Sequence, residues 1–157
     1  MAMVEVNTGD LIGPALDWVM ATIEELPIRH DPMAFGNTFN GGYWVWDDKP
    51  NGAMHLMIRP PAPTTPSREI SSYYSPSTQW AQLGPLRDKY RVHICPIIYN
   101  DQQWDEAWVD APVKAASVYG PTAPIAVCRA IALHKHGPRV SIPNSLFQQM
   151  TAAGGIQ

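Results

Sequence analysis

The sequence predicts an α+β fold: a single compact domain in which a small antiparallel sheet packs with two main helices and several short helical turns. Two Gly-Pro dipeptides open stretches with apolar residues at helical spacing, and several shorter stretches alternate apolar and polar residues. Sixteen prolines and eleven glycines, scattered without a fixed period, indicate many turns between these elements. The length of 157 residues is typical of one domain, so we expect a single domain over residues 1–157.

Composition and charge narrow the classes of partner. The formal net charge of −3 is offset by no local run of Lys and Arg, so polymeric nucleic acid is not an expected partner. No stretch approaches the roughly 20 apolar residues of a membrane span, and residues 1–10 lack the features of a signal peptide. We therefore expect a cytosolic protein that binds no membrane. Cys95 and Cys128 form no C-x-x-C pair, and neither a metal nor a cofactor is predicted.

Residues 14–26 are predicted to form a helix with one apolar face. Pro14 suits the first helical position, because the N–H that proline lacks would have no partner there, and Pro27 ends the helix. The apolar residues that recur at helical spacing are Leu16, Val19, Ile23 and Leu26.

The middle of the chain is expected to contain a β-hairpin. Residues 43–46 and 55–58 have the composition of strands, and the Pro-Asn-Gly sequence at residues 50–52 suits a turn between them. A proline-rich loop follows at about residues 60–70, and its prolines favour an extended connection with few ladder hydrogen bonds.

Residues 75–85 predict a short helix with strong boundaries. Ser75 can cap its start, and Pro76 suits the first helical position. Gly84 followed by Pro85 is expected to close it.

Two stretches with period-two alternation, residues 90–95 and 106–111, are expected to pair as antiparallel strands. The face predicted to meet the core carries Val92, Ile94, Ala107 and Val109. The opposite face carries Arg91, His93, Glu106, Trp108 and Asp110.

A second long helix is expected after the Gly-Pro-Thr sequence at residues 120–122, and it ends near residue 136, before Gly-Pro at residues 137–138. Its apolar stripe consists of Ile125, Cys128, Ile131 and Ala132. A short strand at residues 139–142 and a helical turn from Asn144 complete the prediction.

Three motifs give the chain a resemblance to a known family. They are Leu16-Asp17-Trp18, the segment from Tyr74 to Gln82 with Gly84-Pro85, and Gly120-Pro121-Thr122 leading to Ile125-Ala126 and Arg129. Over roughly residues 9–143 the chain resembles the NinX family of small proteins encoded by tailed bacteriophages. It departs from the family pattern at Leu83 and Pro124, and its stretches at residues 60–66 and 96–104 are longer than typical members need. The resemblance implies a phage origin, and hence action in the host cytoplasm, without an established activity.

The sequence contains no recognisable catalytic machinery. His134 and His136 lie two positions apart on a predicted helix, so their side chains point to different faces. His93 and Cys95 share a strand face, but no third group is placed to orient them. Neighbouring carboxylates diverge, and no glycine-rich phosphate loop occurs. We therefore predict that the protein is not an enzyme and has no catalytic residue.

Hydroxyl-rich helix starts and abundant aromatic residues favour binding of a small anionic, nucleotide-like ligand. Aromatic rings stack on bases, and helix N-termini present free N–H groups to phosphate. The predicted ligand-binding residues are Tyr74, Ser75, Ser77, Thr78, Trp80, Arg91, Trp108 and Thr122. With the phage origin, they predict a non-enzymatic phage accessory protein, a sponge that sequesters a host immune nucleotide signal. A homo-oligomer with sites between subunits suits such a role.

Three other interpretations stay open. The hydroxyls of this set can simply cap helices, and its aromatic side chains can fill core. The protein can instead mask a host protein with an exposed aromatic surface, either the Trp108 face or the strand that carries Trp44 and Trp46. A nucleotide hydrolase would depend on His93.

Overall fold

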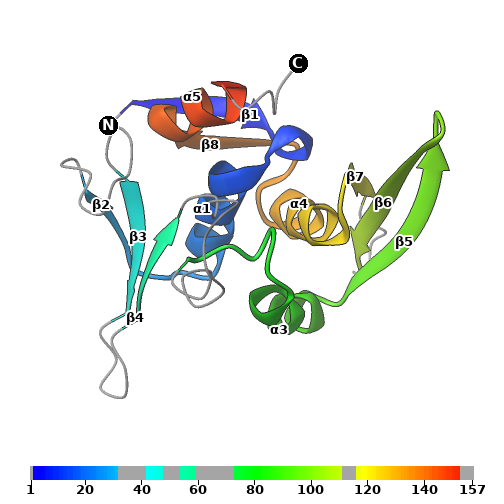
Figure 1. Cartoon of the computed structure of the whole chain (residues 1–157), viewed down its shortest axis with the longest axis horizontal. Helices are drawn as coiled ribbons and strands as arrows, with labels where there is room; N and C mark the ends of the chain where they lie inside the picture. The colour runs from blue at the N-terminus through cyan, green and yellow to red at the C-terminus, as the bar shows by residue number, and fades with distance from the viewer. Residues whose placement is uncertain (1, 32–41, 48–53, 59–72, 111–115, 153–157) are drawn as a thin grey trace.

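The computed structural model describes residues 2–31, 42–47, 54–58, 73–110 and 116–152. It confirms the α+β class, with helices packed against small antiparallel sheets. In chain order the elements are β1 (Met3–Asn7), the 3-10 helix η1 (Thr8–Asp10), α1 (Gly13–Ile23), β2 (Ile28–Asp31), β3 (Gly42–Asp47), β4 (Met54–Ile58), α3 (Trp80–Tyr90), β5 (Val92–Tyr99), β6 (Gln102–Val109), β7 (Val118–Gly120), α4 (Ala123–His136), β8 (Arg139–Pro143) and α5 (Asn144–Ala152). Figure 1 shows α1 and α4 at the centre, with β2, β3 and β4 on one side and β5, β6 and β7 on the other.

The described strands are divided among three antiparallel sheets. β1 pairs with β8, β3 lies between β2 and β4, and β6 lies between β5 and β7. The strand predicted at residues 139–142 is confirmed as β8, whereas its partner β1 was not predicted. α5 covers nine residues where a single helical turn was expected.

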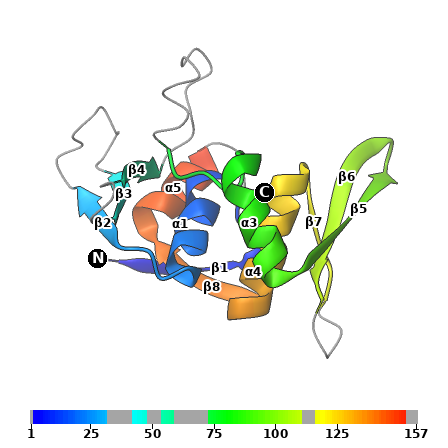
Figure 2. The same cartoon turned by 90° about the horizontal axis from the view of Figure 1, so that it is seen from below.

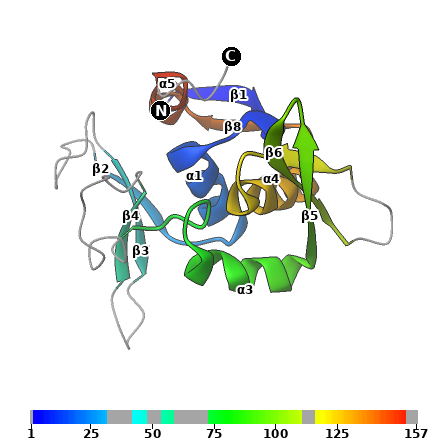
Figure 3. The same ribbon diagram turned by 45° about the vertical axis from the view of Figure 1, so that its right-hand side comes forward.

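The core is built around α1 and α4. α4 packs against α1, α3 and all three strands of the third sheet, and Figures 2 and 3 show α3 alongside it. Its residues from Pro124 to Ala132 are buried without a break, which includes the whole predicted stripe. The predicted start of this helix is also confirmed, because the Thr122 side chain accepts a hydrogen bond from the Ile125 backbone N–H.

The first predicted helix is confirmed as α1, but it ends three residues before Leu26. Glu24 caps the helix, and Glu25 then adopts a left-handed backbone conformation with φ of 55°. A residue with positive φ cannot continue a right-handed helix, so α1 stops ahead of Pro27.

The predicted helix at residues 75–85 is wrong in both boundaries. Ser75 accepts two backbone hydrogen bonds in a turn that precedes α3, and α3 itself runs through Gly84 and Pro85. A proline disfavours a helical residue before it, because its Cδ meets the Cβ of that residue. Gly84 has no Cβ, so the pair is tolerated inside the helix. α3 ends where Arg91 adopts the left-handed conformation.

The hairpin predicted in the middle of the chain is confirmed. β3 and β4 are antiparallel, with Tyr43 opposite Ile58 and Asp47 opposite Met54, and β2 adds a third strand that was not predicted. The predicted turn at residues 50–52 and the proline-rich loop at about residues 60–70 lie outside the described residues.

The second predicted strand pair is confirmed as β5 and β6, with Val92 opposite Val109 as the alternation requires. Both strands are longer than predicted, because they continue to a turn at Asn100 and Asp101. These two residues have φ of 50° and 61°, the positive values that a tight two-residue hairpin turn needs. The predicted first strand started too early, since Tyr90 still belongs to α3.

Candidate functional site

The segment that contains the predicted hydroxyl cluster is attached to a buried carboxylate of α1. Asp17 lies among the buried residues of α1, with Oδ2 3.3 Å from the Ser75 Oγ and Oδ1 3.0 Å from the Ser77 backbone N. Gln82 of α3 holds the segment from the other side: its Oε1 accepts from the Ser75 N–H at 2.7 Å, and its Nε2 donates to the Tyr73 carbonyl at 2.7 Å. The turn before α3 is thus fixed to two helices.

Burial dominates the electrostatics of this cluster. It raises the pKa of Asp17 from the ordinary 3.8 to about 7, although hydrogen bonds from Ser77 and Ser75 favour the charged form. The pKa of Tyr74 is raised by burial and then by the nearby Asp17, and the pKa of Cys128 is raised in the same order of causes. A neutral or anionic cluster without a cation does not attract phosphate.

The predicted hydroxyls therefore link elements of the fold. Ser75 and Ser77 are each 1% exposed, and the Oγ of Ser77 has no hydrogen-bond partner among the described residues. Thr78 is exposed, but its hydroxyl lies 2.5 Å from that of Ser75. Tyr74 is also buried, so the structural interpretation accounts for Tyr74, Ser75 and Ser77.

Trp80 and Thr122 lie at the starts of two different helices. Trp80 is the first residue of α3 and is 50% exposed. Thr122 caps α4, with its Oγ1 3.4 Å from the Ile125 nitrogen. Local helix geometry explains the Thr122 side chain, whereas the exposed ring of Trp80 remains accessible.

Two other predicted residues, Arg91 just before β5 and Trp108 in β6, contact the same pair of side chains, Asp110 and His93 respectively, at the base of the β5–β6 hairpin. The Arg91 Nε is 3.5 Å from an Asp110 carboxylate oxygen, and the His93 Nε2 is 3.7 Å from the same oxygen. The His93 ring stacks on Trp108 with 5.4 Å between centroids and 10° between planes. Arg91 and Trp108 thus share one exposed polar and aromatic surface, separate from the Asp17 cluster in its contacts.

The far end of the same two strands forms an arm. β7 pairs only with residues 105–107 of β6, so residues 102–104 have β5 as their sole described strand neighbour. We call residues 96–105 the β5–β6 arm. Figure 1 shows it projecting away from the helices, and at its tip Ile98 is 75% exposed and Tyr99 67%.

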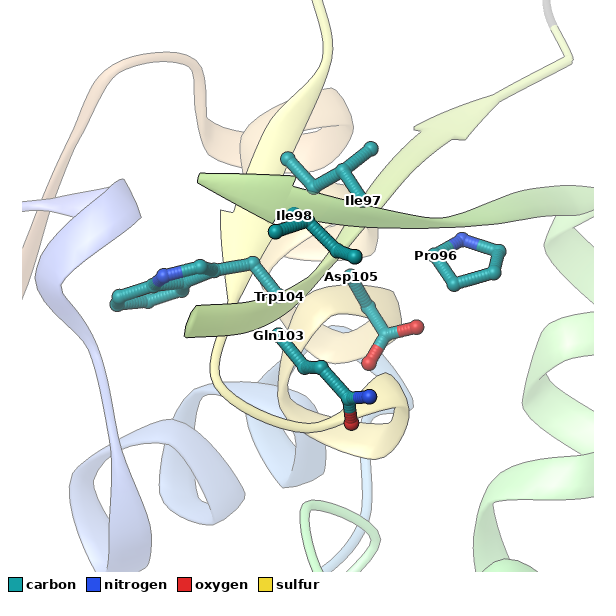
Figure 4. Close-up of a pocket in the computed structure, with 6 residues that line it drawn as sticks. All are labelled: Pro96, Ile97, Ile98, Gln103, Trp104 and Asp105. Atoms are coloured by element: carbon teal, nitrogen blue, oxygen red, sulfur yellow. The ribbon is translucent and has the colours of Figure 1, made fainter. Parts of the chain in front are cut away.

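The arm also carries a hollow of about 550 Å³. Strand alternation places Pro96, Ile98, Gln103 and Asp105 on the face that continues from the core. Figure 4 shows Gln103 and Asp105 extending in the same direction from β6, while the Trp104 ring points elsewhere. The hollow is therefore lined by apolar side chains beside one amide and one carboxylate. The full set of lining residues is Pro96, Ile97, Ile98, Gln103, Trp104 and Asp105.

Comparison with known families identifies the chain. The family model described as bacteriophage P22 NinX matches residues 7–135, which is most of the sequence. The chain belongs to the bacteriophage P22 NinX family. It is accordingly a phage accessory protein. No curated protein matches the chain.

The motifs that resemble NinX place two charged residues in the interior, and neither was among the predicted site residues. Asp17 comes from the first motif. Arg129, from the third, is buried and donates to the carbonyls of Leu11 at 2.7 Å and Tyr119 at 2.8 Å. Burial lowers its pKa. Arg129 lies beside Ile125 and Ala132 on the apolar side of α4, and a charge in such a position was the sequence signal that could have revealed it. Asp17 lies outside the apolar stripe predicted for α1, so helical spacing gave no such signal for it.

Two further observations on this member of the NinX family concern metals and membranes. Among the residues that the structure describes, no three His, Cys, Asp or Glu side chains are grouped so that they could hold a metal ion. No described helix combines the length and the apolar character needed to span a bilayer.

Proposed function

We propose that this phage accessory protein is a non-enzymatic binding protein that modulates a host protein in the host cytoplasm, and that it makes contact through the β5–β6 arm. One observation carries the proposal. Ile98 and Tyr99 are the most exposed large hydrophobic residues of the described chain, and they are adjacent at the tip of one projecting hairpin.

Exposure of Ile98 and Tyr99 to water is unfavourable in free energy, and the fold does not need apolar side chains at these two positions. A two-stranded ribbon is marginally stable in water, and contiguous exposed apolar surface is typical of interaction sites. The arm is fixed at its base, where Val92 and Val109 enter the core, so its tip is held in place before a partner arrives. Such preorganisation lowers the entropy lost on binding.

The outer face of the hairpin extends the same surface toward its base. Ile97 and Tyr99 alternate with the inner residues of β5, and they share this face with Trp104 and Trp108 of β6. Aromatic side chains are enriched in the parts of interfaces that contribute most binding energy. This is the Trp108 face, one of the two aromatic surfaces that the sequence offers for masking a host protein; the other is the strand that carries Trp44 and Trp46.

The test is affinity capture from host lysate with paired variants. Wild-type protein, the double variant Ile98→Ser with Tyr99→Ser, and the control Met3→Ser are immobilised in equal amounts. Met3 is 48% exposed on β1, far from the arm in sequence, so its variant controls for general loss of exposed apolar surface. We expect one stoichiometric host protein on wild type and Met3→Ser and its loss on the arm variant. Equal capture by all three would contradict the proposal.

A second candidate function is binding of a small nucleotide-like ligand, as in a sponge for a host immune signal. The parallel rings of His93 and Trp108 beside the exposed Arg91 guanidinium favour it, because a base can stack there and a phosphate can pair with the guanidinium. Calorimetry with a panel of cyclic and linear nucleotides tests this second function, and the Arg91→Ser variant should show no heat of binding. If no nucleotide of the panel binds to the wild-type protein, this function is eliminated. Formation of a product in the same mixtures would contradict the non-enzymatic proposal. Light scattering checks the homo-oligomer expected of a sponge.

A further inference from the structure

The inner face of the arm is a continuation of the protein core into solvent. Val92 and Ile94 of β5 pack against the core beneath α4, and the next residues on that face, Pro96 and Ile98, are exposed. One face of β5 is therefore buried in its first half and exposed to solvent in its second half. Beyond the reach of α4, the apolar face is covered by nothing that the structure describes, and the hollow of Figure 4 lies there.

The charged residues of the arm are all acidic. No Lys or Arg occurs in the sequence between Arg91 and Lys114. Asp101, Asp105 and Glu106 form no ion pair with any described residue, and Asp105 is half-buried in the lining of the hollow. A carboxylate partly removed from water beside apolar side chains gains most from a cation of a partner.

We propose that the hollow binds a Lys or Arg side chain from an apolar, basic segment of the partner protein. This inference rests on the proposed function, because it names the partner chemistry of the same arm. The aliphatic part of the side chain lies on Pro96 and Ile98, as long basic side chains do on apolar surfaces. Its cationic head pairs with the Asp105 carboxylate, and the Gln103 amide oxygen accepts a further hydrogen bond.

Charge complementarity separates this partner from two others. A second copy placed arm against arm would bring the unpaired carboxylates of both copies together, and like charges across an interface are unfavourable. A nucleic acid would be repelled by the same carboxylates. A basic, apolar polypeptide satisfies both the exposed isoleucine and the unpaired aspartate.

The test uses a short peptide of alternating Lys and Leu as the probe, with a peptide of alternating Glu and Leu as its control. Binding to the full chain is followed by amide chemical shifts and by calorimetry at low and at physiological ionic strength. We expect the Lys peptide alone to bind, with shifts centred on residues 96–105 and affinity that falls with salt. Asp105→Asn and Ile98→Ser should each weaken binding by about threefold to tenfold.

Asp88→Asn is the matched control, because Asp88 is an exposed acidic residue of α3 outside the arm. Equal binding of both peptides, or equal losses for Asp105→Asn and Asp88→Asn, would overturn the inference. A dimer mass that disappears in Ile98→Ser would also overturn it, because a second copy would then occupy the face. If the lysate partner depends on Ile98 and Tyr99 but not on Asp105, the proposed function stands and this inference fails. Circular dichroism confirms that each variant is folded.

Discussion

The carboxylate of Asp17 on α1 accepts a hydrogen bond from the backbone N–H of Ser77, which lies 60 positions further along the chain. The bond joins the first and second motifs of the NinX resemblance through a fully buried acid. Because burial raises the pKa of this acid despite the bond, the stability of the protein should depend on the protonation of its side chain. The hydroxyl cluster predicted to bind a ligand is part of that structural link.

The stability of the protein should fall as pH rises toward neutrality. The pKa of Asp17 is raised from 3.8 to about 7 in the folded state, so the folded protein retains a proton that the unfolded chain releases. The free energy of unfolding therefore has its full Asp17 contribution below about pH 4 and loses it progressively up to about pH 7. Urea denaturation measured across this range is the check.

Asp17→Asn should remove that slope. An amide can accept from the Ser77 N–H with its oxygen and donate to the Ser75 hydroxyl with its nitrogen, and it does not ionise. We expect the variant to be at least as stable as wild type above pH 7. Asp88→Asn serves as the control, because Asp88 is an exposed residue of α3, and it should keep the wild-type slope. A steep slope that persists in Asp17→Asn would show that another group is responsible.

Much of the secondary structure could be predicted because its signals are local. Each helix signal lies within one element: Pro14 and the apolar spacing after it mark α1, and Thr122 and the apolar spacing after it mark α4. In the same way, the alternation within β5 and β6 predicts which of their residues face the core. The helix boundary at Ser75 was wrong because cap, proline and glycine signals were all present there. Tertiary contacts with Asp17 and Gln82 stabilise a turn in their place.

The interior charges could not be paired from the sequence, because their partners are distant. Arg129 bonds to a carbonyl 118 positions earlier, and β1 was missed because its only described partner is β8 at the other end of the chain. For the candidate site, alternation predicted that Arg91 and Trp108 share one strand face; the structure has Arg91 just before β5, as the C-cap of α3, while Trp108 stacks on His93 in β5. Local spacing could not establish whether the predicted hydroxyl residues lie near Arg91 and Trp108. In the structure Ser75, Ser77 and Thr78 belong to the Asp17 cluster instead.

Replacement of Arg129 with methionine should destabilise the protein by roughly 3 kcal/mol, because the buried Leu11 carbonyl and the part-buried Tyr119 carbonyl lose a charged donor while the apolar volume is retained. Arg87→Met is the control: Arg87 is exposed and donates to one carbonyl, that of Val92 at 3.2 Å. Its loss should cost less than about 1 kcal/mol. Chemical denaturation compares the two, and equal losses would contradict the structural role of Arg129.

Gly120→Ala should destabilise the junction between β7 and α4. A Cβ at Gly120 would lie 2.6 Å from the Ala126 backbone nitrogen and 2.9 Å from its Cα, so backbone would have to move. Such overpacking costs about 1–3 kcal/mol. Gly9→Ala is the matched control, since a Cβ there meets nothing within 4 Å, and it should change stability by less than about 0.5 kcal/mol. Thermal unfolding that is the same for both variants would show that the contact relaxes freely.

The tip of the arm should contribute almost nothing to folding stability. Ile98→Ser and Val92→Ser change residues of the same face of β5, but Ile98 is 75% exposed and Val92 only 5%. The tip variant should lie within about 0.5 kcal/mol of wild type, whereas the Val92 variant should lose about 2 kcal/mol through lost apolar burial. Urea denaturation gives both values, and hydrogen exchange should show arm amides opening more readily than those of α4. If Ile98→Ser were as destabilising as Val92→Ser, the arm would belong to the folding core, and its exposure would no longer point to a partner.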